Sequence, residues 1–414
     1  MFPKEIQQNL KHNLAVNIGD GGFFGLGLGF SSFVTILPLF VSTMTNNALL
    51  IGLIPAIHNV GWQLPQLFTA YSTSRQNRYL AMVNRFTVHE RLPFLFLAVV
   101  AWFSPKIGAQ TTLILTFLLL IWQGLGGGFT ATAWQTMIGK IFPADIRGTF
   151  YGAQSAAANL LASIAAVIAG LILERVFMPM DFTICFMVTS VAMMISWFFL
   201  ALTRESPSSE NVFEESKSEF RAKIGIILRS DSNFRWYLVA RILAYFGTIA
   251  FAFYAVYAVQ EHHVSEWKIG LMTGGYLATQ ILANPIMGWI GDQSSHRFTM
   301  VFGMISASIS ALIALLAPSE NWFFLVFILA GIGNVALWTT GLAMILQFGS
   351  DQQRPLYIGL SNTLVAPATI LAPLLAGLIA NITGYSTAFL VSALGGIAAA
   401  AILIIMVKDP RQFV

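Results

Sequence analysis

Hydrophobic residues group into long stretches along the chain, separated by short polar segments. A helix needs about 20 mainly apolar residues to cross a bilayer. The pattern predicts an all-α membrane protein with twelve spans, at roughly 14–42, 48–71, 79–104, 110–139, 148–173, 182–203, 234–260, 267–290, 298–317, 321–348, 356–380 and 386–407.

The composition supports a membrane location. Hydrophobic residues make up 56% of the 414 residues, charged residues only 10%, and the mean hydropathy is +0.72. A soluble domain carries roughly 25% charged residues, so a water-soluble globular enzyme is excluded. The net charge of +4 is too small to indicate nucleic-acid binding, and the single cysteine, Cys185, cannot form an intrachain disulfide. We expect a monomer in the lipid bilayer, with no cofactor and no bound metal.

The distribution of Lys and Arg predicts the orientation of the spans, because loops on the cytoplasmic side are enriched in both. With the N-terminus inside, the cytoplasmic side receives most of the 22 basic residues: Lys4, Lys11, Arg75, Arg78, Lys140, Arg147, Arg204, Lys217, Arg221, Lys223, Arg229, Arg235, Arg297, Arg354, Lys408 and Arg411. We therefore expect a multi-pass protein of the plasma (inner) membrane with both termini in the cytoplasm.

The longest hydrophilic stretch divides the chain near its middle. Residues 204–233 are rich in Ser, Glu and Lys, as a solvated linker should be. Within them, FRAKIGIIL at 220–228 has the pattern of a short interfacial helix, and RESP at 204–207 is interpreted as an ordinary helix stop. The predicted domains are an N-terminal six-helix bundle (1–203), a cytoplasmic linker (204–233) and a C-terminal six-helix bundle (234–414).

The two halves repeat. Five residues of the first half recur in the second at one constant offset of 207: Gly124, Gly126, Arg147, Gly152 and Gly170 match Gly331, Gly333, Arg354, Gly359 and Gly377. Further upstream, IGL at 51–53 matches IGL at 269–271, and NRFT at 84–87 resembles HRFT at 296–299. Two six-span repeats with substrate handled between them are the design of many secondary transporters.

With these features the chain resembles the major facilitator superfamily. The family's motif after the second span is Gly-x-x-x-Asp followed by basic residues, and a counterpart recurs after the eighth span. Here GWIGDQSSHR contains the second copy as Gly288, Asp292 and Arg297. The resemblance implies two pseudo-symmetric six-helix bundles. It also implies that Gly288, Asp292 and Arg297, together with Arg147 and Arg354, form a cytoplasmic gate that holds one conformation closed.

The copy of this motif in the first half of the chain is incomplete. AYSTSRQNR at 70–78 has Ala70 and Ser74 where Gly and Asp are expected. FPADIRGTFYGAQSAAANLL at 142–161 and DQQRPLYIGLSNTL at 351–364 also look like family loops. These motifs are shared across the superfamily and indicate no particular substrate, and no subfamily is assigned.

Ionisable residues inside a membrane are costly and therefore indicate function. Asp20 in the first span is interpreted either as a site for a proton or a cationic partner, or as a hydrated interfacial carboxylate. In the third span Glu90 and Arg91 point about 100° apart on a helix, so each can meet a different neighbour. We expect Arg91 to belong to a charge network at the inner cavity, in which Glu90 or His89 is protonatable.

Two further residues have open alternatives. His58 near the middle of the second span is a candidate coupling site, because imidazole changes charge near neutral pH, or else an interhelical hydrogen-bonding group. Arg241 in the seventh span is predicted to counter an anionic substrate, to pair with Asp20 or Glu90, or to extend to the cytoplasmic interface.

Uncharged polar and aromatic residues predict the substrate cavity. Amides supply paired donors and acceptors, and aromatic rings cover apolar faces, a combination that suits a neutral hydroxylated or amphipathic solute. The candidates are Tyr245, Tyr254, Gln280, Asn284, Asn334, Trp338 and Asn362.

These observations favour a secondary active transporter that moves a small organic solute by alternating access, coupled to a proton. The alternative is a non-transporting membrane sensor or receptor on the same scaffold. The sequence contains no HExxH motif and no GxxxxGK phosphate loop, so an intramembrane enzyme and direct use of ATP are not expected.

Overall fold

The structure is a computed structural model that describes residues 4–207 and 216–410. Arg411 and part of the predicted linker, 208–215, lie outside the described residues. The described chain is almost wholly helical, and the clustering of its contacts divides it into two compact units, each considered separately below. The predicted domain boundaries at 203 and 234 stay a prediction.

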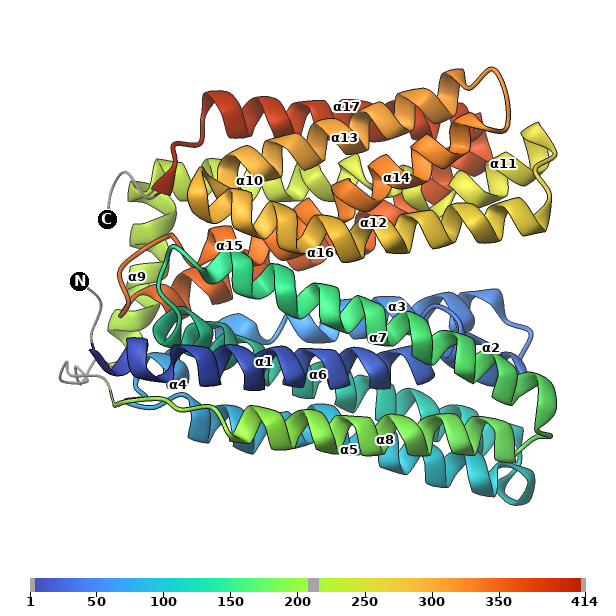
Figure 1. The fold of residues 1–414 in the computed structure, drawn as a ribbon, viewed down its shortest axis with the longest axis horizontal. Coiled ribbons are helices and arrows are strands. Elements are labelled where there is room, and N and C mark those ends of the chain that lie inside the picture. The colour runs from blue at the N-terminus through green and yellow to red at the C-terminus, as the bar shows by residue number, and fades with distance from the viewer. Residues whose placement is uncertain (1–3, 208–215, 411–414) are drawn as a thin grey trace. The chain divides into compact units, whose positions relative to one another are not determined.

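Unit 1 contains residues 1–143, 157–214 and 358–366. Its helices are α1 (Lys4–Phe30), α2 (Ile36–Ser42), α3 (Ala48–Gln63), α4 (Gln66–Ser74), α5 (Leu80–Ile107), α6 (Ala109–Ile141), most of α7 (Arg147–Arg175) and α8 (Met180–Ala201). Helix α5 packs along α6 and α8, α1 packs along α8, and α3 packs along α6 (Figure 1).

Unit 2 contains residues 144–156, 215–357 and 367–414. Its helices are the start of α7 (147–156), α9 (Lys217–Ser230), α10 (Ser232–Gly247), the 3₁₀ turn η1 (Ile249–Ala252), α11 (Tyr254–His262), α12 (Glu266–Gln293), α13 (His296–Leu316), α14 (Trp322–Val335), the π-helical turn η2 (Ala336–Thr340), α15 (Gly341–Ile345), α16 (Arg354–Thr383) except residues 358–366, and α17 (Tyr385–Ile405). Helix α13 packs against α14 and α17, and α17 also packs against α10 (Figure 1).

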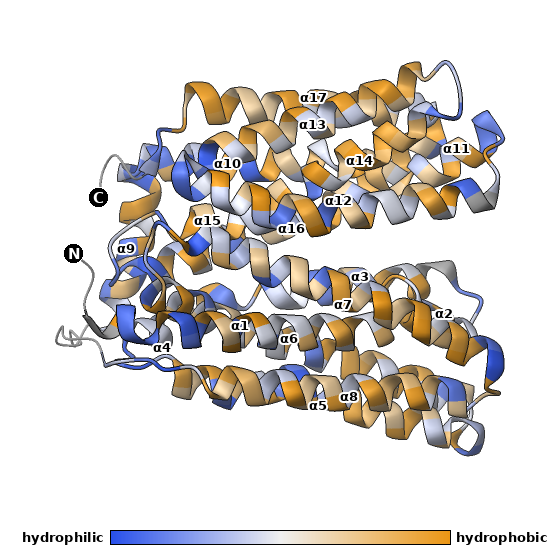
Figure 2. Ribbon diagram, viewed as in Figure 1, coloured by the Kyte–Doolittle hydropathy of each residue, from blue (hydrophilic) through white to orange (hydrophobic). Residues whose placement is uncertain are grey.

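The twelve predicted spans are confirmed by this helix order. Nine helical segments of the described chain are long and apolar enough to cross a membrane. The other three spans are α1 with α2, α3 with α4, and α12. The second span is broken at Pro65, which has no N–H with which to continue the helix. Hydrophobic residues cover most of each helix, and hydrophilic residues concentrate at the helix ends and on α9 (Figure 2).

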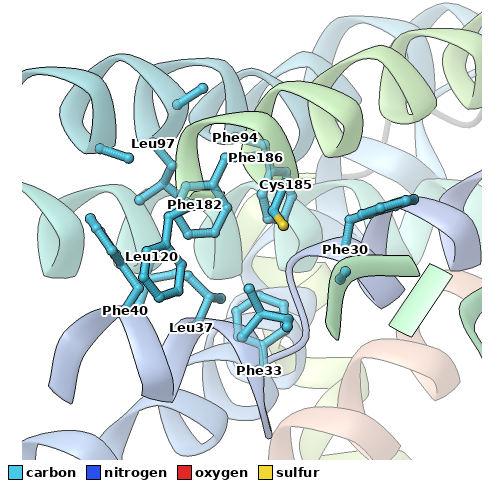
Figure 3. Packing of buried hydrophobic residues seen from close by; sticks show 14 of the residues in the cluster. Phe30, Phe33, Leu37, Phe40, Phe94, Leu97, Leu120, Phe182, Cys185 and Phe186 are labelled. Atoms are coloured by element: carbon cyan, nitrogen blue, oxygen red, sulfur yellow. The ribbon is translucent and has the colours of Figure 1, made fainter. Parts of the chain in front are cut away.

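Each unit has its own hydrophobic core. In unit 1, aromatic and aliphatic side chains from α1, α2, α5, α6 and α8 converge on one cluster, which includes Phe30, Leu37, Phe94, Leu120 and Phe186 (Figure 3). In unit 2, the corresponding cluster joins η1, α11, α13, α14 and α17. The helix predicted within the linker is present as α9, which begins with a capping box at Ser216 and Glu219, and its location at a membrane interface stays a prediction.

Candidate functional site

A buried charge cluster lies in unit 1, where α1, α5 and α8 meet. Arg91 of α5 places Nη2 3.0 Å from Oδ1 of Asp20 on α1, and the same nitrogen donates to Oγ of Ser196 on α8 at 2.9 Å. Ser196 donates to Asp20 at 2.6 Å. The Asp20, Arg91 and Ser196 side chains therefore form a closed hydrogen-bonded triangle across three helices.

Glu90 is the second carboxylate of this cluster. Its Oε2 lies 3.4 Å from Nη1 of Arg91, and Arg91 is further held by Thr87 and by the ring of Phe24, whose centroid is 5.3 Å from the guanidinium carbon. Asp20, Glu90 and Arg91 are 5%, 8% and 3% exposed. Two acidic groups thus share one permanent cation in a site nearly closed to water.

The local sequence explains how Glu90 reaches this position. A methyl group placed on Gly126 of α6 would overlap the backbone of His89 and Glu90, and one placed on Gly127 would lie 2.8 Å from Oε1 of Glu90. Only glycine lets α6 approach α5 this closely. The Gly-rich segment 124–128 therefore makes room for the charged segment of α5.

The net charge of the cluster depends on how many of its two carboxylates are protonated. A buried cation offsets one buried carboxylate, but a second unbalanced charge in a low-dielectric site is costly. With one carboxylate protonated, the Asp20, Glu90 and Arg91 group is neutral. Asp20 has the shorter bonds, to Arg91 and Ser196, whereas Glu90 has the longer contact to Arg91.

Amide side chains form a second polar group in unit 1. Oε1 of Gln66 accepts from Asn362 at 2.7 Å and from Gln135 at 3.3 Å, and all three residues are buried. His58 bonds to Gln123 at 3.0 Å and stacks on Phe33 with 4.0 Å between ring centroids. The predicted cavity residue Asn362 is thus placed with Gln66 and Gln135, which the sequence-based prediction did not single out.

Three predicted cavity residues meet in unit 2. Asn334 of α14 donates to Oε1 of Gln280 on α12 at 2.8 Å, and Asn284, one turn further along α12, accepts from Thr339 of η2. Thr339 is also 3.2 Å from the hydroxyl of Ser155. Thr339 lies in the π-helical turn Ala336–Thr340, a local widening that often marks functional positions.

The aromatic candidates are distributed differently. Tyr245 and Trp338 pack edge to face with 6.1 Å between ring centroids. Tyr254 instead lies in the hydrophobic core of unit 2, where its hydroxyl bonds to Ser310 at 3.0 Å. Arg241 is buried, with its guanidinium carbon 6.0 Å from the ring centroid of Tyr237 one turn away. The structure therefore brings Tyr245 and Trp338 together and places Tyr254 elsewhere.

The motif residue Asp292 caps a helix N-terminus. Its Oδ1 accepts from the backbone N–H of Gly148 at 2.8 Å, and its Oδ2 accepts from that of Thr149 at 2.5 Å. Both donors belong to the first turn of α7, whose dipole favours a negative charge at this position. His296 places Nε2 3.2 Å from Oδ1 of the same carboxylate.

The other predicted gate residues are Gly288, Arg147, Arg354 and Arg297, and the structure gives contacts or positions for each of them. A methyl group on Gly288 would overlap the carbonyl oxygen of Gly148, so glycine is required where α12 meets α7. Arg147 and Arg354 are the first residues of α7 and α16, and Arg147 donates to the carbonyl of Leu346 at 3.4 Å. Arg297 donates to the carbonyl of Val407 at 2.6 Å. Among the described contacts, Asp292 thus binds backbone N–H groups of α7 and lies beside His296, and Arg297 binds a backbone carbonyl.

A carboxylate outside the motif caps a helix in unit 1. Ser74, which stands where the motif Asp is expected, donates to the carbonyl of Tyr71. Glu205 instead accepts from the backbone N–H groups of Tyr79 and Leu80 at 2.9 and 2.8 Å, and it pairs with Lys140 at 2.8 Å. The RESP segment is thus more than a helix stop, because its Glu caps the start of α5.

The family of the chain follows from a match over most of its length. The model described as Major Facilitator Superfamily matches residues 90–265 and again residues 237–412. This chain belongs to the Major Facilitator Superfamily. The two successive matches agree with the repeat seen in the sequence.

Two superfamily relatives illustrate the range of the sequence matches. The probable vesicular acetylcholine transporter-B of Danio rerio is 25% identical over 142 residues, which cover 34% of this chain and 29% of that protein. Multidrug resistance protein 1 of Bacillus subtilis is 22% identical over 154 residues, covering 37% of this chain and 39% of that protein. The matched stretches span well under half of these relatives.

Solved superfamily structures share the fold over nearly the whole chain. The transporter FucP in the outward conformation superposes with a TM-score of 0.78 at 14% identity, covering 95% of this chain and 98% of that one. The proton:xylose symporter XylE superposes with a TM-score of 0.74, also at 14% identity, covering 98% and 99%. At such low identity the likeness concerns the fold alone.

Proposed function

We propose that this protein is a secondary active transporter that moves a small organic solute by alternating access and couples the movement to a proton. The observation that carries the proton coupling is the buried group in which Asp20 and Glu90 share Arg91. A site with two carboxylates and one fixed cation has two charge states that differ by one proton, and their relative free energies depend on access to water.

Glu90 is the proposed proton carrier. When it is protonated, the cluster is neutral and stable in its closed, buried form. When it loses the proton, the excess negative charge favours a conformation in which water reaches the site. Protonation and conformation are thereby linked, as a coupled transporter requires. His58 is a second candidate, because its ring is positioned by Gln123 and Phe33.

The polar groups of the two units support a neutral, hydrogen-bonding solute. In unit 1, Oε1 of Gln135 and Nε2 of Gln123 are buried without a partner among the described residues. In unit 2, Gln280, Asn284 and Asn334 supply further amides beside the aromatic pair Tyr245 and Trp338. Amides and aromatic rings together can bind a solute that has hydroxyl groups and an apolar face.

The membrane orientation is part of the proposal. The excess of Lys and Arg in alternate loops favours cytoplasmic termini in the plasma (inner) membrane. The chain offers a direct test, because Cys185 is its only cysteine and is buried. Single cysteines introduced at Gln76 and at Gln110 in a Cys185→Ser background should react with a membrane-impermeant maleimide from opposite sides.

Flux in sealed proteoliposomes tests the function. Purified full-length protein is reconstituted, solutes that stabilise it against thermal unfolding are selected, and their flux is measured with and without an imposed proton gradient. Gradient-dependent accumulation of a stabilising solute, lost on collapse of the gradient, supports the proposal. Binding without any flux indicates a receptor on this scaffold, and flux that is insensitive to the proton gradient contradicts proton coupling.

A further inference from the structure

A cavity of about 630 Å³ lies in unit 1 where α1 and α5 begin and α8 ends. Its polar and charged lining residues are Asn9, Arg78, Asn84, Thr203, Arg204, Glu205 and Ser206. Neither the charge cluster nor the amide groups described above belong to this lining. The cavity is therefore a separate feature at the ends of three helices.

The cavity carries an excess of positive charge. Arg78 is exposed and has no hydrogen bond or ion pair to any residue that the structure describes. Among the described residues, the guanidinium of Arg204 has one long contact, of 3.5 Å to Asn9. The one acidic lining residue, Glu205, has a side chain 1% exposed that is already bound by two backbone N–H groups and by Lys140. Its charge is therefore offset and turned away from an incoming anion.

The walls of the cavity are held in place by hydrogen bonds. The side chain of Asn13 donates to the carbonyl of Arg204 at 2.9 Å and accepts from its N–H at 2.9 Å, which fixes the backbone that carries this arginine. Asn84 accepts from Nε1 of Trp197 at 3.2 Å. Two guanidinium groups at one cavity, one of them on a fixed backbone, suit a phosphate, since arginine binds phosphate oxygens in a bidentate manner.

The surface next to the cavity is apolar. Phe198 and Leu202, on the last turns of α8 before Arg204, are 62% and 41% exposed. A phosphate held by the arginines would thus lie at the end of an exposed hydrophobic strip, in the arrangement of a lipid headgroup and its acyl chains.

The related position in unit 2 lacks this charge excess. A cavity of about 370 Å³ lies where α13 begins and α17 ends, and its charged lining residues are Arg297 and Asp409. There the single arginine already donates to the carbonyl of Val407, and an aspartate accompanies it. The cationic character is therefore particular to the unit 1 cavity.

We propose that the unit 1 cavity binds a phosphate group through Arg78 and Arg204, carried by an anionic lipid headgroup or free in solution. The proposal does not depend on transport, because binding alone measures it.

The test uses full-length protein in nanodiscs of phosphatidylcholine with added phosphatidylglycerol, followed by native mass spectrometry of the retained lipid. The wild type should retain phosphatidylglycerol in preference to phosphatidylcholine. Arg78→Gln and Arg204→Gln should each reduce that retention about fivefold, the factor expected for one basic residue at an anionic surface. Arg78→Lys should retain more phosphatidylglycerol than Arg78→Gln but less than the wild type, because it keeps the charge and loses the bidentate guanidinium.

The matched control is Arg75→Gln. Arg75 is an exposed arginine of the same loop, three residues from Arg78, but it is bound to the hydroxyl of Tyr71 at 3.1 Å and does not line the cavity. Retention should be unchanged in this variant. Inorganic phosphate at millimolar concentration distinguishes the two sources of the phosphate group. If it displaces phosphatidylglycerol from the wild type but not from Arg78→Gln, free phosphate occupies the site. If it displaces no lipid from the wild type, the site binds the lipid headgroup.

Equal retention of phosphatidylglycerol in wild type, Arg78→Gln and Arg204→Gln would overturn the proposal, and so would an equal loss in Arg75→Gln. Thermal unfolding of each variant in phosphatidylcholine alone separates loss of the site from loss of the fold. If Arg204→Gln unfolds, Arg78→Gln decides the outcome, because Arg78 is exposed and makes no described contact that supports the fold.

Discussion

Arg91 binds Asp20 across two helices of unit 1, with 3.0 Å between Nη2 and Oδ1 and both side chains buried. The partners are 71 residues apart in the sequence and are joined further through Ser196. This pair connects α1 with α5 and, through Ser196, with α8. Glu90 is therefore the carboxylate with the longer contact to the guanidinium of Arg91.

Replacing Glu90 with Gln should separate coupling from transport. The amide keeps the size of the side chain but cannot take up or release a proton. We expect proton-driven accumulation of the solute to be lost while counterflow exchange continues. The matched control is Glu174→Gln, which changes an exposed glutamate near the end of α7. Accumulation with wild-type pH dependence in Glu90→Gln would contradict the assigned role.

Asp20→Asn should destabilise unit 1. Removing one partner of a buried ion pair typically costs about 3–5 kcal/mol, and this is the upper value here because Glu90 still lies 3.4 Å from Arg91 and offsets part of its charge. We expect a lower midpoint of thermal unfolding in detergent, with part of the loss restored by the double variant Asp20→Asn, Arg91→Gln. An unchanged midpoint for the single variant would show that the pair contributes little, and the same assay on Glu90→Gln should show a smaller effect.

Asp292→Asn should weaken the cap on α7. The neutral amide retains one acceptor oxygen for the N–H groups of Gly148 and Thr149, and it no longer interacts with the helix dipole. The effect at a buried helix end is about 2 kcal/mol. We expect reduced flux at near-normal expression, and faster hydrogen exchange over residues 148–152.

The control for the cap is Asp145→Asn. Asp145 is an exposed carboxylate just before the same helix, so its replacement should leave both flux and exchange unchanged. If the two variants behave alike, the carboxylate of Asp292 has no special role in holding α7.

Two asparagines should stabilise corresponding helix ends in the two units. Asn13 bonds to both backbone groups of Arg204, and Asn233 bonds in the same way to those of Lys408, at 3.0 and 2.7 Å. Asn13→Ala or Asn233→Ala leaves these backbone groups without their partner, at a cost of about 1–3 kcal/mol each.

The expected result is faster hydrogen exchange after α8 in the first variant and after α17 in the second. Asn321→Ala, at an exposed position, serves as the control. Faster exchange after α17 in Asn13→Ala, or after α8 in Asn233→Ala, would contradict the proposed equivalence of the two asparagines.

The cap of α9 should respond to pH. The pKa of Glu219 lies below its ordinary value, chiefly because the carboxylate accepts a hydrogen bond from the backbone N–H of Ser216 and then one from its hydroxyl. A lowered pKa in the folded state stabilises the helix above the ordinary pKa, and this contribution is lost as the pH falls through the lowered value.

Hydrogen exchange of residues 217–222, corrected for intrinsic rates, should therefore show weaker protection in acid. Glu219→Gln should remove this pH dependence, and Ser216→Ala should only weaken it, because the backbone N–H of residue 216 still donates to Glu219. Ser230→Ala, at the other end of α9, should retain it. Equal pH dependence in wild type and Glu219→Gln would exclude the capping box as its source.

The sequence by itself determined the membrane class, the twelve spans and the duplication, because each rests on a local or periodic property. Span length and apolar content follow from bilayer thickness. The repeat is visible wherever a glycine or arginine recurs at a fixed offset, as Arg147 and Arg354 do. The motif from Gly288 to Arg297 was enough to indicate the superfamily, which the family match confirmed.

Only the tertiary structure decided which polar residues meet. Periodicity shows that Glu90 and Arg91 point in different directions, but it does not show that Arg91 meets Asp20 and Ser196 from two other helices. For the same reason Glu205, Asn13 and Gln66 were not predicted: their partners are backbone groups or side chains far away in the sequence. A hydrogen bond depends on a separation of about 3 Å between two atoms, and helix packing fixes that separation through contacts that no single segment encodes.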